Sequence, residues 1–179
     1  MTIRWKKWIL AMSGALIVFI AIGFLLPQCQ TVQRHITTKA APEKLFTQLS
    51  TLKRWPLWTA WNTNRFPDMT MHFEGSDSGA GAIMKARGKT SGNGTVYITR
   101  AVMREGVWYD LDFENGTQIF HCAITYSPQE NDFVVTWRVE ACLGRNPLKR
   151  WAGLAIDSLM GGDMETGLRQ LIQQAEGAP

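Results

Sequence analysis

The sequence has few of the residues that usually mark catalytic or metal sites. Its 179 residues include only three histidines and three cysteines, and nothing in the sequence places a nucleophile beside a base. His35, His72 and His121 are far apart and fall on the polar faces of predicted strands, whereas a catalytic zinc needs three convergent ligands. We therefore predict no metal site, no cofactor and no hydrolytic activity.

Internal repeats, low-complexity tracts and a surplus of basic charge in the main part of the chain are missing as well. Arg4, Lys6 and Lys7 precede an apolar run and leave 16 basic against 15 acidic residues after it. A nearly neutral domain has no basic stripe with which to release phosphate counterions, so nucleic-acid binding is not expected. The stretch 92–94 (GNG) predicts a hairpin turn rather than a phosphate cradle, because no helix pattern follows it.

The feature that stands out is one long uncharged run. Residues 9–26 are 18 positions without a charged side chain, enough at about 1.5 Å each to cross most of the ~30 Å hydrocarbon layer. Trp5 and Trp8 stand at its entrance beside basic residues, which favours a cytoplasmic N-terminus. The expected organisation is a cytoplasmic basic tail (1–8), a transmembrane anchor (9–26) and one domain (30–176). The domain should lie outside the cytoplasm, in the periplasm if the cell is Gram-negative.

Three other interpretations of this run fit less well. A cleaved signal peptide usually has an apolar run of about 7–15 residues and a small-x-small cleavage site, which residues 26–28 (LPQ) do not offer. A lipoprotein signal ending at Cys29 would need a small residue before that cysteine, where this chain has Gln28. A helix of a small soluble domain would keep one face at the surface and show a polar stripe there, and here every face is apolar.

After the run, the pattern predicts mostly strands. Alternation around Val32 indicates a first strand, and a helix with an apolar stripe should begin at Pro42. Pro56 limits the tryptophan-rich stretch 54–61 to a short helical turn. Residues 69–137 read as short alternating strands separated by glycine-rich turns, which is typical of an antiparallel meander.

Two predicted hairpins agree on which face of this meander is apolar. A two-residue turn at residues 115–116 would pair Phe113, Leu111, Tyr109 and Val107 with Gln118, Phe120, Cys122 and Ile124. A turn within residues 128–131 would pair Tyr126, Ile124, Cys122 and Phe120 with Phe133, Val135, Trp137 and Val139. Continuing the same face backwards turns Arg100 inward unless a β-bulge intervenes.

The last segment, residues 146–176, predicts one long helix. Asn146 is a good N-cap and Pro147 suits the first helical position, while Gly161 and Gly162 should kink the middle. Strand, helix, meander and terminal helix together make an α+β domain. Its curved antiparallel sheet should wrap around the C-terminal helix and leave a cavity between them.

Several stretches carry a family resemblance. They are residues 41–46 (APEKLF), 54–61 (RWPLWTAW), 79–82 (GAGA), and 146–154 together with 163–171. In these the chain resembles the START-like superfamily, also called SRPBCC, in its polyketide cyclase and lipid transport branch. The resemblance implies the helix-grip fold over residues 32–176, with an apolar small molecule or lipid bound between sheet and helix. Some members of the family cyclise or dehydrate polyketides, but none of these stretches is a catalytic signature.

The candidate ligand contacts are large apolar side chains and one arginine: Trp58, Trp61, Arg100, Tyr109, Phe120, Trp137, Trp151, Met160 and Met164. Ordinary core packing is the alternative for each apolar one. An inward Arg100 would need a ligand carboxylate or phosphate, or a structural ion pair with a residue such as Asp112. Cys122 is interpreted as a small buried residue that is not bridged to Cys142, whereas a disulfide that involves Cys29 stays open in an oxidising compartment.

The leading functional hypothesis is a membrane-anchored, non-enzymatic binding domain. Its partners would be a hydrophobic small molecule or lipid in the cavity, and the bilayer through the N-terminal helix. One alternative is a polyketide cyclase or dehydratase-like enzyme in which Tyr109 or Arg100 polarises a carbonyl. The other is an envelope protein-interaction module without a ligand.

Overall fold

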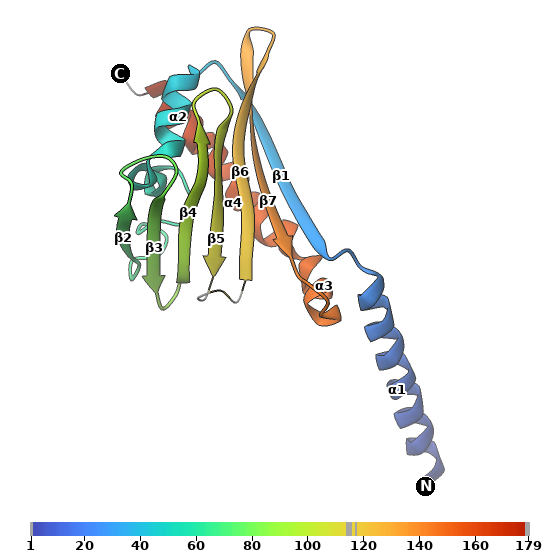
Figure 1. Cartoon of the computed structure of the whole chain (residues 1–179). Coiled ribbons are helices and arrows are strands. Elements are labelled where there is room, and N and C mark those ends of the chain that lie inside the picture. The colour runs from blue at the N-terminus through green and yellow to red at the C-terminus, as the bar shows by residue number, and fades with distance from the viewer. Residues whose placement is uncertain (1, 114–115, 117, 178–179) are drawn as a thin grey trace.

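The computed structural model describes residues 2–113, 116 and 118–177. A helix at the N-terminus projects from one end of an α+β domain (Figure 1). The elements in chain order are α1 (Thr2–Leu25), β1 (Cys29–Thr38), α2 (Pro42–Ser50), the 3-10 helix η1 (Leu52–Leu57), β2 (Thr70–Gly75), β3 (Ala82–Gly88), β4 (Gly92–Val102), β5 (Gly106–Phe113), β6 (Gln118–Gln129), β7 (Asp132–Cys142), α3 (Pro147–Gly153) and α4 (Ile156–Gly177).

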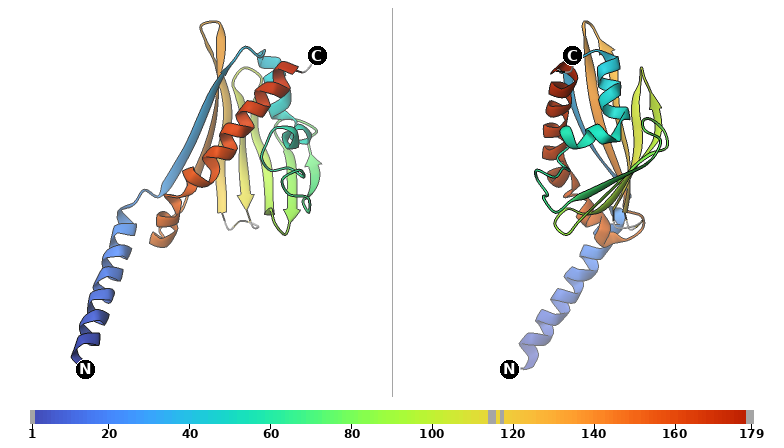
Figure 2. Two further views of the ribbon diagram at one scale, coloured as in Figure 1. Left: turned by 180° about the vertical axis from the view of Figure 1, so that it is seen from behind. Right: turned by 90° about the vertical axis from the view of Figure 1, so that its left-hand side faces the viewer.

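The seven strands form one antiparallel sheet in the order β1-β7-β6-β5-β4-β3-β2. Helix α4 crosses one face of this curved sheet, and α2 and η1 cover the rest of that face (Figure 2). Alternating strand residues and one stripe of α4 meet there, as the helix-grip expectation requires. The largest fully buried side chains of this layer include Trp58, Met84, Ile124, Met164 and Leu168.

The register of β5 against β6 is as predicted. Tyr109 lies opposite Cys122, and Leu111 lies opposite Phe120. Residue 115 of the predicted turn lies outside the described residues.

The register of β6 against β7 differs by two residues from the prediction. Tyr126 pairs with Val135 rather than Phe133, and Cys122 pairs with Val139 rather than Trp137. The reason is that the turn lies one residue further along the chain: Gln129 pairs with Asp132, and Glu130 adopts a positive φ of 52° in the two-residue loop. A shift of two keeps every side chain on its face, so the inward and outward sets were predicted correctly.

The C-terminal segment is two helices rather than one kinked helix. The break falls after Gly153, and α4 runs through Gly161 and Gly162 without interruption. Gly161 serves close packing, because a Cβ there would meet the Arg34 guanidinium at 2.2 Å. Gly153 packs equally closely on Leu143, which sets α3 against the end of the sheet.

A disulfide joins the first residue of β1 to the last residue of β7. Cys29 and Cys142 lie directly opposite one another in the ladder. Cys122 is free and buried, as the sequence predicted.

Among the described residues, one helix is long and apolar enough to cross a membrane. Within α1, Trp8–Leu25 has a mean hydropathy of 2.4, and 6% of it is buried. A core helix would be mostly buried, whereas a signal sequence meets the same criteria of length and composition.

Candidate ligand-binding cavity

A cavity of about 260 Å³ lies between the sheet and α4. Strands β3 to β5 and β7 supply one wall, the first half of α4 supplies another, and the segment after η1 closes the side. Its lining is predominantly apolar and consists of Trp55, Thr59, Ala60, Trp61, Arg65, Phe66, Met84, Ser91, Val96, Tyr109, Leu111, Phe113, Trp137, Met160, Asp163 and Met164.

The inner end of the cavity carries a hydrogen-bonded group that remains uncharged at neutral pH. Trp137 Nε1 donates to Tyr109 Oη at 2.8 Å, and Cys122 lies against the same hydroxyl. Burial raises the pKa of the Tyr109 hydroxyl well above its usual value, and it raises the pKa of the Cys122 thiol to about 12. The inner end therefore presents a neutral surface suited to an apolar guest.

Tryptophans behind this group fix its position. Trp55 meets Tyr109 edge-on at 4.8 Å between ring centroids, and its Nε1 donates to the Leu49 carbonyl at 2.9 Å. Trp58 packs edge-on against Trp137 at 5.7 Å. Because these rings are packed on several sides, the inner wall is preformed rather than assembled by a ligand.

The outer end of the cavity holds its charged residues. Arg65 Nη1 donates to Asp163 Oδ1 at 2.7 Å and joins the segment after η1 to α4. Trp61 packs on Phe113 with ring centroids 5.5 Å apart. Gly94 allows this position of the indole, since a Cβ there would meet Trp61 at 2.2 Å.

The mouth lies at the end of the sheet from which α1 projects. Its partly exposed residues include Ser91, just before β4, and Phe113, the last residue of β5. Figures 1 and 2 show these strand ends on the same side of the domain as α1 and α3.

Five of the nine predicted contacts line the cavity: Trp61, Tyr109, Trp137, Met160 and Met164. Trp58 stands behind the wall, and Phe120 packs on Phe113 outside the lining. Whether any of these residues binds a ligand stays a prediction.

Arg100 and Trp151 lie elsewhere, which corrects their expected placement. A β-bulge between Ile98 and Arg100 shifts the register, so Arg100 is exposed, pairs with Glu105 and lies over the Trp108 ring at 4.3 Å. The outward position of Arg100 is the alternative stated from the sequence, in which a β-bulge reverses the side on which Arg100 lies. Trp151 stacks on Phe19 of α1, a contact that no strand or helix pattern indicates.

Several residues that line the cavity are not among the contacts predicted from the sequence. Leu111 and Val96 belong to the same inward-facing alternation as Tyr109, so the strand periodicity of the sequence was sufficient to predict them as lining residues. The irregular segment between η1 and β2 brings Arg65 and Phe66 to Asp163 of α4. The sequence of such a segment has no helix or strand periodicity from which its path could be predicted.

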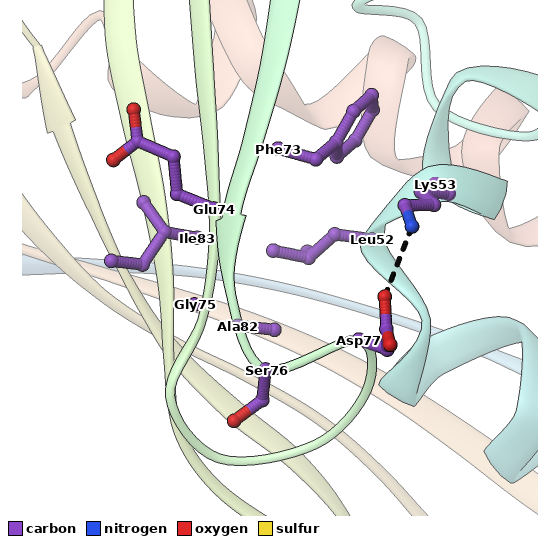
Figure 3. A pocket seen from close by; sticks show the side chains of 9 residues that line it. All are labelled: Leu52, Lys53, Phe73, Glu74, Gly75, Ser76, Asp77, Ala82 and Ile83. Atoms are coloured by element: carbon purple, nitrogen blue, oxygen red, sulfur yellow. Dashed lines mark hydrogen bonds and ion pairs between the residues drawn. The ribbon is translucent and has the colours of Figure 1, made fainter.

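Two further hollows are less suited to an apolar ligand. A depression of about 310 Å³ on the outer face of the sheet is bordered by polar side chains that already contact one another, His121 with Asp110 and Arg138 with Glu140. A pocket of about 50 Å³ between η1 and the β2–β3 turn is bordered by the Lys53–Asp77 ion pair (Figure 3).

Metal binding has little support in the described part of the chain. His35, His72 and His121 are all exposed and lie on different strands. Cys29, Glu140 and Cys142 bring three potential ligand atoms together, but the disulfide occupies both sulfurs.

The fold and the apolar cavity between its sheet and α4 define a helix-grip domain. Residues 30–176 match the family described as polyketide cyclase / dehydrase and lipid transport. This match covers most of the chain, and the protein belongs to that family. No curated protein matches the sequence.

Solved structures show the same fold at low sequence identity. Protein CV1439 from Chromobacterium violaceum is 16% identical with a TM-score of 0.54, and the match covers 82% of this chain and 96% of that one. The hypothetical protein jhp0584 from Helicobacter pylori is 8% identical with a TM-score of 0.61, covering 82% and 88%.

The di-domain ARO/CYC StfQ from the steffimycin biosynthetic pathway is 13% identical with a TM-score of 0.62, covering 84% of this chain and 51% of that protein. This chain thus spans about half the length of StfQ. At these identities the likeness concerns the fold alone.

Proposed function

We propose that this protein is a bilayer-anchored binding domain that holds one hydrophobic molecule, such as a lipid chain, between its sheet and α4. The observation that carries the proposal is the apolar cavity, whose inner end is lined by neutral side chains. Binding would come mainly from apolar burial, at about 25 cal/mol per Å². A volume of about 260 Å³ suits a compact guest or part of one acyl chain.

The family supports this class of ligand. Its description joins cyclases and dehydrases to lipid transport, and these activities share an apolar guest in the cavity. Within the described lining, Asp163 is engaged by Arg65, and burial keeps Tyr109 protonated. Because no side chain there is placed as a free base, binding is favoured over catalysis.

Two features support a position outside the cytoplasm. The apolar part of α1 follows a basic stretch in the sequence, as expected for a cytoplasmic N-terminus. The Cys29–Cys142 disulfide is the kind of bond that persists in oxidising compartments.

The cavity can be tested by filling it. The full chain in detergent micelles is incubated with palmitic acid or with a total lipid extract, and retained molecules are counted by native mass spectrometry. Leu111→Trp places an indole in the cavity, whereas Ile119→Trp adds the same ring to an exposed site on the next strand. Losing about 60 Å² of apolar contact costs ~1.5 kcal/mol, so Leu111→Trp should weaken binding by about tenfold.

The matched variant makes the result interpretable. Ile119→Trp should bind like the wild type. Equal binding by both variants would show that retained lipid lies elsewhere, for example along α1. Absence of any bound molecule in the wild type would contradict the proposal.

A further inference from the structure

Helix α3 packs along the last part of α1. The Trp151 ring stacks on Phe19 with centroids 4.7 Å apart and an interplanar angle of 5°, and its Nε1 donates to the Phe19 carbonyl at 3.0 Å. Gly23 permits this approach, because a Cβ there would meet Pro147 at 2.7 Å. The two helices are therefore fitted to one another by small and flat groups.

Arg150 fastens the same junction from the domain side. This buried guanidinium donates through Nη1 to the carbonyls of Phe24 at 2.7 Å and Leu26 at 3.1 Å, and through Nε to Gly144 at 2.9 Å. Carbonyls in the last turn of a helix lack intrahelical partners and carry its negative end, so a cation there is stabilising. The end of α1 and the domain consequently behave as one body.

This packing fixes where α3 would lie relative to a membrane. The step rests on the proposed function, in which α1 spans the bilayer. Phe19 precedes the end of α1 at Leu25 by six residues, which is about 9 Å of helix at 1.5 Å per residue. Interfacial helices lie about 5–10 Å into the boundary between headgroups and acyl chains, so α3 falls in that layer.

The surface of α3 suits that layer. Leu148 is 58% exposed and Leu154 is 51% exposed, beside the amphipathic Trp151. Between residues 141 and 156 the chain has no acidic residue, and Arg145 and Lys149 are exposed, whereas Arg150 is buried in the junction. Exposed leucines with a neighbouring indole and basic side chains match an acyl boundary and anionic headgroups.

We propose that α3, together with Leu154, is a second membrane contact that lies in the bilayer interface and holds the cavity mouth toward the lipid surface. The mouth is bordered by Ser91 and Phe113, which adjoin the start of β4 and the end of β5. These strand ends lie on the same side of the domain as α1 (Figures 1 and 2), so this contact places the mouth next to the leaflet. A hydrophobic guest could then enter from the leaflet with a short path through water.

Nitroxide labels on the full chain test the contact. The chain is reconstituted in vesicles of equal parts phosphatidylcholine and phosphatidylglycerol, and a Cys122→Ala background removes the free thiol. Single cysteines then replace Leu148 at the proposed contact, Ile17 in the anchor, and Met103, which is 50% exposed in the turn between β4 and β5. Collisions of each label with oxygen, which concentrates in lipid, are compared with collisions with a water-soluble nickel chelate.

The ratio of oxygen to nickel collisions at position 148 should exceed that at position 103 by about threefold or more, because interfacial residues reach the acyl boundary. If position 17 reads as lipid while position 148 reads like position 103, the second contact is refuted and the anchor stands. If position 17 also reads as water-exposed, the anchor fails and the inference fails with it.

Two glycines of α1 offer a matched pair of variants for the packing step. Gly23→Leu would collide with Pro147, whereas Gly14 has no atom within 4 Å of the added Cβ. Both variants should keep the lipid signal at position 17. Gly23→Leu should lower the ratio at position 148 by about threefold, to the level of an exposed site, and Gly14→Leu should leave it unchanged. An unchanged ratio in Gly23→Leu would overturn the role given to the α1–α3 packing.

Discussion

Removal of the disulfide should weaken the domain substantially. Cys29 and Cys142 are 113 residues apart in the chain, so their bond closes a loop that includes nearly all of the sheet. Loop-closure entropy for this length corresponds to about 5 kcal/mol of the free energy of unfolding at 25 °C. For a domain of this size each kcal/mol shifts Tm by about 2–4 °C, which gives a fall of roughly 10–20 °C.

The assay is thermal unfolding of the full chain in micelles, followed by far-UV circular dichroism, with and without a phosphine reductant. The double variant Cys29→Ser/Cys142→Ser should melt at the lower temperature in both conditions. The wild type should fall to that temperature only when reduced. If the reduced wild type melts within about 2 °C of the oxidised protein, the bond does not constrain the unfolded chain as argued.

Three further outcomes follow from the cavity. Tyr109→Phe leaves the Trp137 N–H buried without an acceptor, so urea denaturation should show a loss of about 1–3 kcal/mol. Gly94→Val should push the Trp61 ring out of its place and weaken retention of palmitic acid in native mass spectrometry by about tenfold, a cost of ~1.4 kcal/mol. Burial raises the pKa of Cys122 from 9.0 to about 12; the unfolded thiol therefore loses its proton first, and the free energy of unfolding should decline from pH 9 to 12, less steeply in Cys122→Ala.

The first two variants have controls on β4, and the third prediction is checked by the sign of the pH dependence. Tyr97→Phe removes a hydroxyl from an exposed tyrosine of β4 and should leave the urea midpoint nearly unchanged. Thr95 is next to Gly94 in the chain and does not line the cavity. The Thr95→Val variant should therefore bind palmitic acid like the wild type. If the free energy of unfolding instead increased as the pH was raised from 9 to 12, this would contradict the burial assigned to Cys122.

The inward face of the sheet could be predicted because strand alternation has a period of two. A two-residue error in pairing β6 with β7 therefore changed the partners of Tyr126 and Cys122 but not the face on which they lie. The bulge that exposes Arg100 breaks the period at one residue, and a single sequence does not show on which side of Thr99 the extra residue falls.

The contacts of the C-terminal segment could not be predicted in the same way. The pair Gly161 and Gly162 predicts a kink from the sequence. In the structure Gly161 instead makes room for the Arg34 guanidinium, a neighbour that is known only from the assembled fold. The pairing of Arg150 with carbonyls of α1 joins positions more than 120 residues apart. A helix pattern indicates which face is apolar, but it does not identify a carbonyl elsewhere in the chain as the partner of a buried cation.

The junction between α1 and the domain bears on what α1 would do as the proposed anchor. A tether that only raised local concentration would work through a flexible linker. Here three residues separate α1 from β1, and the carbonyls of two of them are engaged: Leu26 by Arg150, and Gln28 by the Leu143 N–H at 2.8 Å. The disulfide closes the next position. A linker held at each of these points transmits orientation as well as proximity, so the direction in which the cavity opens follows from the direction in which α1 points.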